Sequence, residues 1–150
     1  MRIGAFGCVL ASCLILASVA QADESFSVIF GQKVVGHLTS EANDGETRVV
    51  FDYKNNGRGP TLAETIRLDA KGLPVAWRIS GATTFGSKVD EHFNQVGDQA
   101  SWNDSVGSGT FDAPERRLYI GQSASPWALG IYARALLADI DHSIPTLPAG

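Results

Sequence analysis

The chain has 150 residues, with 12 basic and 16 acidic side chains and a net charge of −4. Charges of both signs alternate and form no basic block, which argues against nucleic acid or an anionic membrane surface as a partner. The length suits one domain with one core, and the sequence shows no internal repeat and no low-complexity tract.

The first 22 residues have the order of a secretory signal peptide. Arg2 is followed by a long uncharged apolar run, and Ala20-Gln21-Ala22 supplies the small residues that a signal peptidase requires. We therefore expect cleavage after Ala22 and a secreted or periplasmic location. A membrane anchor is the competing interpretation, but the run over 3–20 only just approaches the ~20 residues of a spanning helix.

Cys13 offers a second processing route, because Leu10-Ala11-Ser12-Cys13 has the form of a lipoprotein signal. The apolar run continues past Cys13, whereas a lipid-anchored chain normally turns polar after its anchor, so we favour cleavage over lipidation. Both Cys8 and Cys13 precede the expected cleavage site. The mature chain would then have no disulfide and no cysteine metal ligand, and its 11 basic and 16 acidic residues would give a net charge of −5.

From residue 25 to about 103 the sequence alternates apolar and polar residues with the period of two that half-buried strands require. Turn signals separate the short strands, among them Asn43-Asp44-Gly45, whose residues tolerate positive φ. The pattern predicts a mainly β (α+β) fold, an antiparallel meander forming a curved sheet or half-barrel. We expect aromatic side chains to fill one core face: Phe26, Phe30, Phe51, Tyr53, Trp77, Phe93 and Trp102.

The sequence after the meander predicts a loop, a short strand and one helix. Residues 104–116 are polar and Gly-rich and predict a surface loop, and 117–121 predicts a short strand. Ser125 suits an N-cap and Pro126 the first helical position, and apolar residues then recur at helical spacing. The expected organisation is a signal peptide at 1–22, an antiparallel β domain at 23–122, a C-terminal helix at 123–139 and a Pro-containing linker at 140–150 that leads to a further domain.

The segment 55–60, NNGRGP, lies between two predicted strands. Backbone N–H groups near its glycines, together with the Arg58 guanidinium, could bind an anion. The alternative is a left-handed or bulged connection that the glycines permit and Pro60 stiffens, and we favour it. We keep three candidate ligand-binding residues: Asn56, Arg58 and Trp77.

A metal site at Asp90-Glu91-His92 is a weaker interpretation than a solvated strand. On a strand, Asp90 and His92 share one face while Glu91 points away, so two ligands could converge. A third ligand is not evident, and polar residues on the solvent-exposed face of a strand would account equally well for this sequence. We therefore assign no metal-ligating residue.

The sequence around Ser123 imitates a nucleophile elbow, because a predicted strand is followed by Gly121-x-Ser123-x-Ser125 and a helix. That chemistry also needs a parallel α/β sheet upstream and a positioned acid–histidine pair. The sheet is missing, and His142 is the only histidine downstream. We favour an N-capped helix and assign no catalytic residue.

Three stretches of the sequence resemble the N-terminal region of a known family. They are residues 53–93, YKNNGRGPTLAETIRLDAKGLPVAWRISGATTFGSKVDEHF, then ASW, and later SASPWALGIYARALL. These stretches are similar to the β-rich leader of secreted bacterial amidohydrolase-family proteins, the imidazolonepropionase-like metal-dependent hydrolases. In those proteins, similar Asn-Gly-Arg-Gly-Pro and Thr-Thr-Phe-Gly segments precede a (β/α)₈ barrel. The resemblance covers about residues 26–150, and its motifs are not catalytic.

The resemblance implies a barrel that holds a divalent metal such as zinc with a His-x-His, further histidines and an aspartate. This sequence has no His-x-His, and ~128 residues are too few for a barrel of ~250. We therefore expect a non-catalytic accessory domain, or a truncated fragment, of a secreted hydrolase acting on amide-type C–N bonds. Its partner would be the barrel, in cis or in trans, and this chain would hold no cofactor of its own.

Two functions of other classes remain open. The chain could be a stand-alone periplasmic module whose curved sheet holds a small apolar ligand against Trp77, Phe51 and Trp102. A serine hydrolase that uses Ser123 is the least favoured interpretation.

Overall fold

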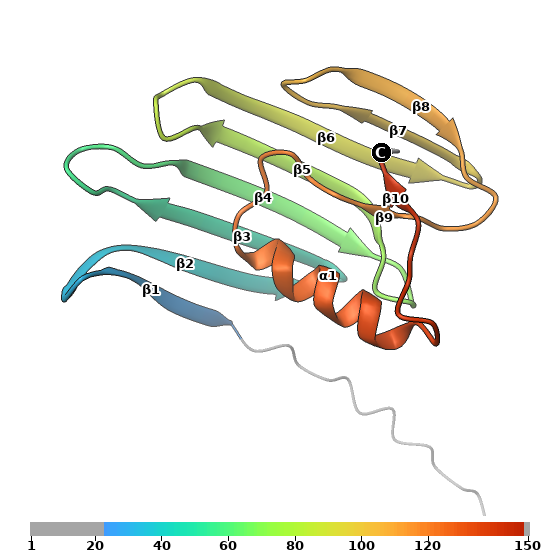
Figure 1. Cartoon of the computed structure of the whole chain (residues 1–150), viewed down its shortest axis with the longest axis horizontal. Coiled ribbons are helices and arrows are strands. Elements are labelled where there is room, and N and C mark those ends of the chain that lie inside the picture. The colour runs from blue at the N-terminus through green and yellow to red at the C-terminus, as the bar shows by residue number, and fades with distance from the viewer. Residues whose placement is uncertain (1–22, 149–150) are drawn as a thin grey trace, which may run out of the picture.

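One large antiparallel sheet, crossed on one face by a helix, dominates the computed structural model, which describes residues 23–148 (Figure 1). Eight strands follow one another in chain order, each paired with the next, and the sheet is open at β1 and β8. The predicted mainly β meander is therefore confirmed, whereas the expected signal peptide lies outside the described residues. The strands are β1 (Glu24–Phe30), β2 (Lys33–Asn43), β3 (Glu46–Tyr53), β4 (Thr61–Leu68), β5 (Pro74–Ala82), β6 (Lys88–Val96), β7 (Gln99–Asn103) and β8 (Ser108–Asp112).

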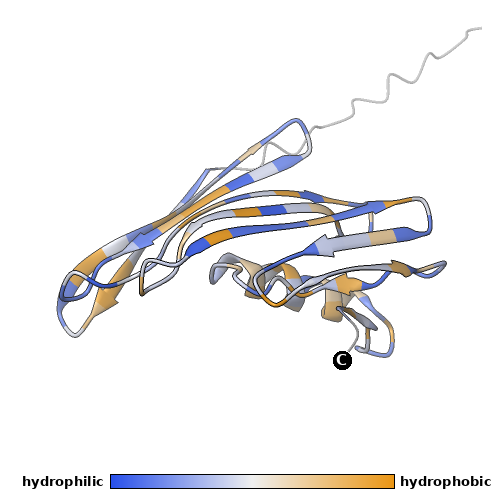
Figure 2. Ribbon diagram, turned by 90° about the horizontal axis from the view of Figure 1, so that it is seen from above, coloured by the Kyte–Doolittle hydropathy of each residue, from blue (hydrophilic) through white to orange (hydrophobic). Residues whose placement is uncertain are grey.

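The sheet is curved, and the C-terminal part of the chain lies on one side of it (Figure 2). The helix α1 (Trp127–Ala138) begins one residue after the predicted Pro126, and the Ser125 hydroxyl accepts a hydrogen bond from the Trp127 N–H at 3.3 Å. A second, two-stranded sheet pairs β9 (Leu118–Tyr119) in parallel with β10 (Thr146–Leu147). Leu147 in the segment predicted as a linker is thus fully buried.

The prediction of a loop over 104–116 was wrong, because β8 forms within it and pairs with β7. In this strand Phe111 is the single large apolar residue, so the alternation that identifies a strand is weak. Gly109 is required here by packing, since a Cβ atom at that position would overlap the indole of Trp102. Tight cross-strand packing, which sequence periodicity does not report, therefore defines this strand.

The predicted hairpin turn at 43–45 is confirmed. Asn43 pairs with Glu46, and the two residues between them, Asp44 and Gly45, have φ values of 48° and 76°. Positive φ at both central positions is the mark of a type I′ turn, whose twist matches that of the flanking strands.

The core lies between the helix-facing side of the sheet and α1. Of the seven aromatic residues expected there, Phe51, Trp77 and Phe93 are buried, and two others pack against the core in part, Tyr53 and Trp102. The expectation was wrong for Phe26 and Phe30, which are 52% and 65% exposed. They lie on the edge strand β1, whose register also shifts between Val28 and Ile29. The alternation of apolar and polar residues along a strand does not show whether another element of the fold covers its apolar face.

Candidate functional site

Two glutamates lie on the buried face of the sheet, among apolar side chains. Glu64 on β4 and Glu91 on β6 are only 3% and 1% exposed. Both lie opposite Ile79 on the intervening strand β5, so their Cα atoms are about 10 Å apart, or two strand spacings. A buried carboxylate is costly unless hydrogen-bond donors surround it, so the partners of these two groups define the site.

Glu64 connects the sheet to the residue that precedes α1. Its Oε1 accepts a hydrogen bond from the Ser125 backbone N–H at 2.6 Å, and its Oε2 accepts one from Trp77 Nε1 at 2.9 Å. Burial raises the pKa of Glu64, and the hydrogen bonds from Ser125 and Trp77 oppose that shift. The indole N–H of Trp77 is thereby satisfied inside the core.

Glu91 accepts hydrogen bonds from residues of the loop that precedes α1, as Glu64 does. Its Oε1 accepts hydrogen bonds from the Tyr119 hydroxyl at 2.7 Å and the Gln122 N–H at 2.8 Å, and its Oε2 accepts one from the Ser123 N–H at 2.9 Å. The Tyr119 ring stacks on Phe93 with a centroid distance of 4.3 Å. Burial and the bond to Glu91 raise the pKa of Tyr119 far above its ordinary value, so the hydroxyl remains a donor.

We call Glu64, Glu91 and the loop N–H groups that they accept, over 122–125, the carboxylate clamp. All four carboxylate oxygens of the clamp accept hydrogen bonds from the chain itself. The Tyr132 hydroxyl adds to it from the helix, because it accepts the Gly121 N–H at 3.0 Å. With its acceptors occupied in this way, the clamp fixes where α1 starts and in which direction it runs.

Ser123 and His142 do not form a nucleophile–base pair. Ser123 precedes α1 and donates its N–H to Glu91, whereas His142 follows the helix and its Nδ1 lies 3.0 Å from the Leu136 carbonyl oxygen. The 12 residues of α1 rise about 18 Å, so the two residues lie at opposite ends of the helix. The elbow-like spacing therefore belongs to the clamp loop.

Asp90 and His92 lie on the exposed face of β6, opposite to Glu91. Asp90 forms ion pairs with Lys88 at 3.1 Å and with Arg78 at 3.3 Å, and its hydrogen bond with Lys88 keeps the pKa of Asp90 below its ordinary value. Over residues 23–148, no group of three or more His, Cys, Asp or Glu side chains could hold a metal ion.

The NNGRGP segment forms a tight hairpin turn. The Asn55 N–H donates to the Arg58 carbonyl at 2.8 Å, and the Arg58 N–H donates to the Asn55 carbonyl at 3.0 Å. Between them, Asn56 and Gly57 have φ values of 51° and 74°, which again gives a type I′ turn. The turn itself accounts for the Asn-Gly pair.

The three candidate ligand-binding residues lie in different environments. Asn56 and Arg58 are exposed, and Arg58 lines a hollow of about 510 Å³ together with residues 82–86, at the end of β5 and in the β5–β6 loop. Trp77 is 1% exposed and does not line that hollow, because its side chain packs under α1. No single surface of the described chain presents all three side chains.

The helix α1 carries a second apolar face, which points away from the sheet. Its inner face is buried through Ala128, Ile131 and Ala135. Apolar residues that recur at i, i+4, i+7 and i+8 form, together with Ile140 just beyond the end of the helix, what we call the outer stripe: Leu129, Ala133, Leu136, Leu137 and Ile140. The four larger members are 67%, 38%, 76% and 91% exposed in that order. A helix that is apolar on both sides is typical of a buried helix.

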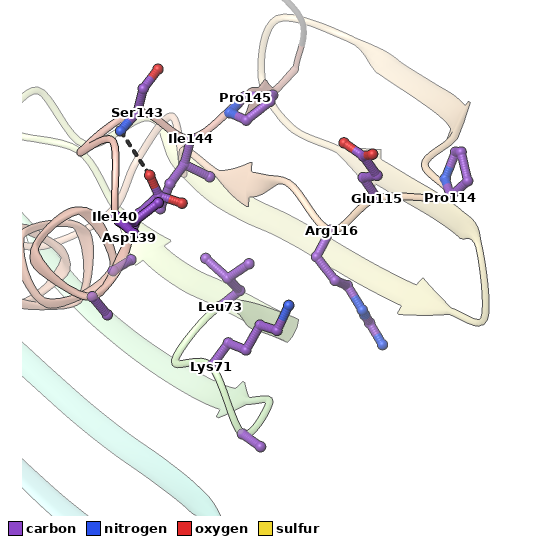
Figure 3. A pocket seen from close by; sticks show the side chains of 13 residues that line it. Lys71, Leu73, Pro114, Glu115, Arg116, Asp139, Ile140, Ser143, Ile144 and Pro145 are labelled. Carbon is purple, nitrogen blue, oxygen red and sulfur yellow. Dashed lines mark hydrogen bonds between the residues drawn. The ribbon is translucent and has the colours of Figure 1, made fainter.

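Beside the outer stripe lies a hollow of about 860 Å³, which we call the end hollow (Figure 3). It is bordered by the turn that carries Lys71 and Leu73, by 114–116 and by 139–145. Arg116 Nη1 is buried there without a hydrogen-bond partner among the described residues, and its Nε lies 3.9 Å from Asp69 Oδ2. A buried guanidinium N–H without a partner calls for an acceptor.

On the other side of α1, a groove of about 380 Å³ separates the helix from β1–β3. We call it the edge groove. Its lining is mainly apolar, with one acidic and one basic residue: Glu24, Phe26, Val28, Leu38, Phe51, Pro126, Trp127, Gly130 and Arg134.

Comparison with known proteins adds no relative to this description. No family model matches the chain, and neither a curated protein nor a solved structure matches it. Within 23–148, none of the helical structure is long and apolar enough to cross a membrane.

Sequence reasoning missed the clamp, although one signal was present. In Leu62-x-Glu64-x-Ile66 and in Val89-x-Glu91-x-Phe93, a glutamate occupies the inward phase of the alternation. An acidic residue between two apolar ones of the same phase indicates a buried, hydrogen-bonded carboxylate.

Proposed function

We propose that this chain is a non-catalytic accessory domain of a secreted or periplasmic amidohydrolase-family protein, whose metal-dependent barrel hydrolyses amide-type C–N bonds. The resemblance of 53–93 and 123–137 to the leader of such proteins supports the family assignment. One structural observation carries the proposed role, namely the outer stripe of α1. The domain would pack against the barrel through this stripe, and the catalytic metal would belong to the barrel.

The energetics of the outer stripe favour a covering partner. Leu129, Leu137 and Ile140 are each more than two-thirds exposed, and burying one such side chain contributes up to ~1.5–3 kcal/mol. The clamp holds the start of α1 on the sheet, so the stripe is presented as a rigid ridge and little conformational entropy is lost on docking. A partner would thus convert α1 into a helix that is buried on two sides.

The end hollow would supply the polar part of the same interface. Arg116 Nη1 has no acceptor within residues 23–148, and Ala138 and Ile140 border the hollow at the end of α1. The Arg116 side chain is 36% exposed, so a barrel that presents a carboxylate or a backbone carbonyl here would reach the exposed part of the guanidinium. Arginine next to an apolar cluster is a frequent combination at the centre of protein interfaces.

The test begins with the DNA that follows the codon of Gly150 and with adjacent reading frames, which identify the barrel to be used. That barrel and the chain are co-expressed as separate polypeptides, and complex formation is measured by sedimentation velocity. We expect a 1:1 complex that Leu129→Gln with Leu137→Gln weakens at least tenfold. Val106→Gln is the matched control, because Val106 is 78% exposed but lies in the β7–β8 turn.

Two results would overturn the proposal. One is that no frame in the neighbourhood encodes a barrel with a His-x-His. The other is that the encoded barrel and the chain stay separate, or that the Val106 control weakens the complex as much as the Leu129 and Leu137 pair does.

A second candidate function, a stand-alone ligand-binding module, is supported by a different observation, the edge groove. Phe51 borders this groove, as that hypothesis requires, whereas Trp77 and Trp102 do not line it. Co-purification of a small apolar compound with a monomeric, well-folded chain would favour this function over the accessory role.

A further inference from the structure

We infer that the edge groove binds a small molecule with a flat apolar body and a single carboxylate. The inference deepens the second candidate function and rests on it, and it does not depend on the outer stripe, which lies on another face of α1. Aromatic and aliphatic side chains form the walls of the groove, and one arginine without an ion-pair partner in the described chain lies at its rim.

The apolar walls come from the edge of the sheet and from the start of α1, which meet at the aromatic pair of Phe26 and Trp127. Phe26 of β1 is 52% exposed, and its ring centroid lies 6.5 Å from that of Trp127 at the start of α1. Val28, Leu38 and Phe51 complete the sheet side. The volume of about 380 Å³ falls within the range of small-molecule sites, which is ~300–1,000 Å³.

The helix side of the groove is left open by a glycine. Gly130 is the fourth residue of α1, and within a helix glycine costs roughly 0.5–1 kcal/mol relative to alanine. A Cβ atom there would lie 3.2 Å from Arg134 Nη1, so the guanidinium folds back over the bare backbone of Gly130. Gly130 thus makes room for the charged group of Arg134 at the rim of the groove.

The charges at the rim select a monoanion. Among residues 23–148, Arg134 has neither an ion pair within 4.0 Å nor a side-chain hydrogen bond, although Glu24 lines the same groove. A guanidinium binds a carboxylate through two parallel N–H donors, which a neutral amide cannot match. The Glu24 carboxylate would repel any negative charge on the ligand. It therefore weakens the binding of a monoanion somewhat and disfavours a dianion more strongly.

The experiment compares two probes of the same shape, 1-naphthylacetate and 1-naphthylacetamide, by calorimetric titration of the purified protein. We expect saturable binding of both, with the acid roughly fivefold tighter, as one partly exposed charge pair provides. Arg134→Gln should abolish the preference for the acid, Glu24→Gln should increase it, and Phe26→Ala should weaken both probes. Leu137→Gln, on the outer stripe, is the control and should change neither affinity.

Each contrary outcome identifies what has failed. Equal affinities for the acid and the amide, or a preference that persists in Arg134→Gln, overturn the ligand class. Absence of saturable binding of both probes overturns the site together with the ligand-binding function, and it leaves the accessory role to be judged by complex formation with the barrel. Circular dichroism of each variant shows that a lost affinity does not arise from unfolding.

Discussion

Glu64 and Glu91 lie in register on either side of Ile79 and together accept three backbone N–H groups of the loop that leads into α1. The sheet thereby holds the start of the helix through hydrogen bonds as well as through apolar contacts. Because the clamp sets the position of α1, it also sets the direction of the outer stripe and the width of the edge groove.

Glu91→Leu should destabilise the fold by about 3–5 kcal/mol, because one buried and two part-buried donors lose their acceptor at once. These donors are the Tyr119 hydroxyl and the N–H groups of Gln122 and Ser123. Urea unfolding followed by tryptophan fluorescence measures the loss. Asp90→Ala is the control, since the neighbouring residue on the exposed face should change stability little, and equal losses in the two variants would refute the role of the clamp.

The stability contribution of Glu64 should fall as the pH rises. Burial raises the pKa of Glu64 in the folded chain, so the folded state holds its proton more tightly than the unfolded state does. The contribution is complete below the unfolded pKa of about 4.3 and is lost as the pH rises through the folded pKa. The difference in unfolding free energy between the wild type and Glu64→Gln, measured from pH 4 to pH 8, should shrink with pH. A constant or growing difference contradicts this expectation.

Gly59→Ala should destabilise the β3–β4 hairpin, whereas Arg58→Ala should leave its stability nearly unchanged. A Cβ atom at Gly59 would overlap the carbonyl oxygen of Tyr53, so the strands would have to move apart. The Lys54 ammonium, which donates to the Gly59 carbonyl at 2.7 Å, would lose that bond as well. Arg58 is exposed and only its backbone closes the turn. Thermal unfolding compares the two variants, and a larger loss in Arg58→Ala would point to a structural role for the guanidinium.

Replacing Leu129 and Leu137 with glutamine should leave the unfolding free energy within about 0.5 kcal/mol, because both side chains are exposed in the isolated chain. Self-association at high protein concentration should decrease, since an exposed apolar ridge promotes it. Sedimentation velocity and urea unfolding measure the two effects. A large loss of stability would show that the outer stripe packs against this chain itself.

Local sequence was sufficient for much of the fold. Alternation from β1 to β7 and the Asn-Gly and Asp-Gly pairs predicted the meander, because strand pairing between neighbours in sequence needs only short turns of defined φ. The helix was predicted to within one residue at its start from Ser125 and Pro126. In contrast, β8 was missed, since a Gly109 that accommodates Trp102 carries no periodic signal.

The candidate sites depended on contacts between distant segments. Glu91 and Gln122 are 31 residues apart and Glu64 and Ser125 are 61 apart, so no local pattern joins them. The alternation places both glutamates in the inward phase, which indicates that they are buried but not which residues they contact. Nothing local indicates that Phe26 stays exposed or that Gly130 opens a groove, because both depend on where α1 crosses the sheet.

The sequence by itself determined the order of the strands, their turns and the presence of a terminal helix, since these follow from periodicity and from backbone sterics over a few residues. Only the tertiary structure decided which face of that helix is buried, which strands remain uncovered and which carboxylates lie inside. The physical reason is that burial belongs to pairs of surfaces: the free energy of an apolar or charged side chain depends on what the rest of the fold places over it.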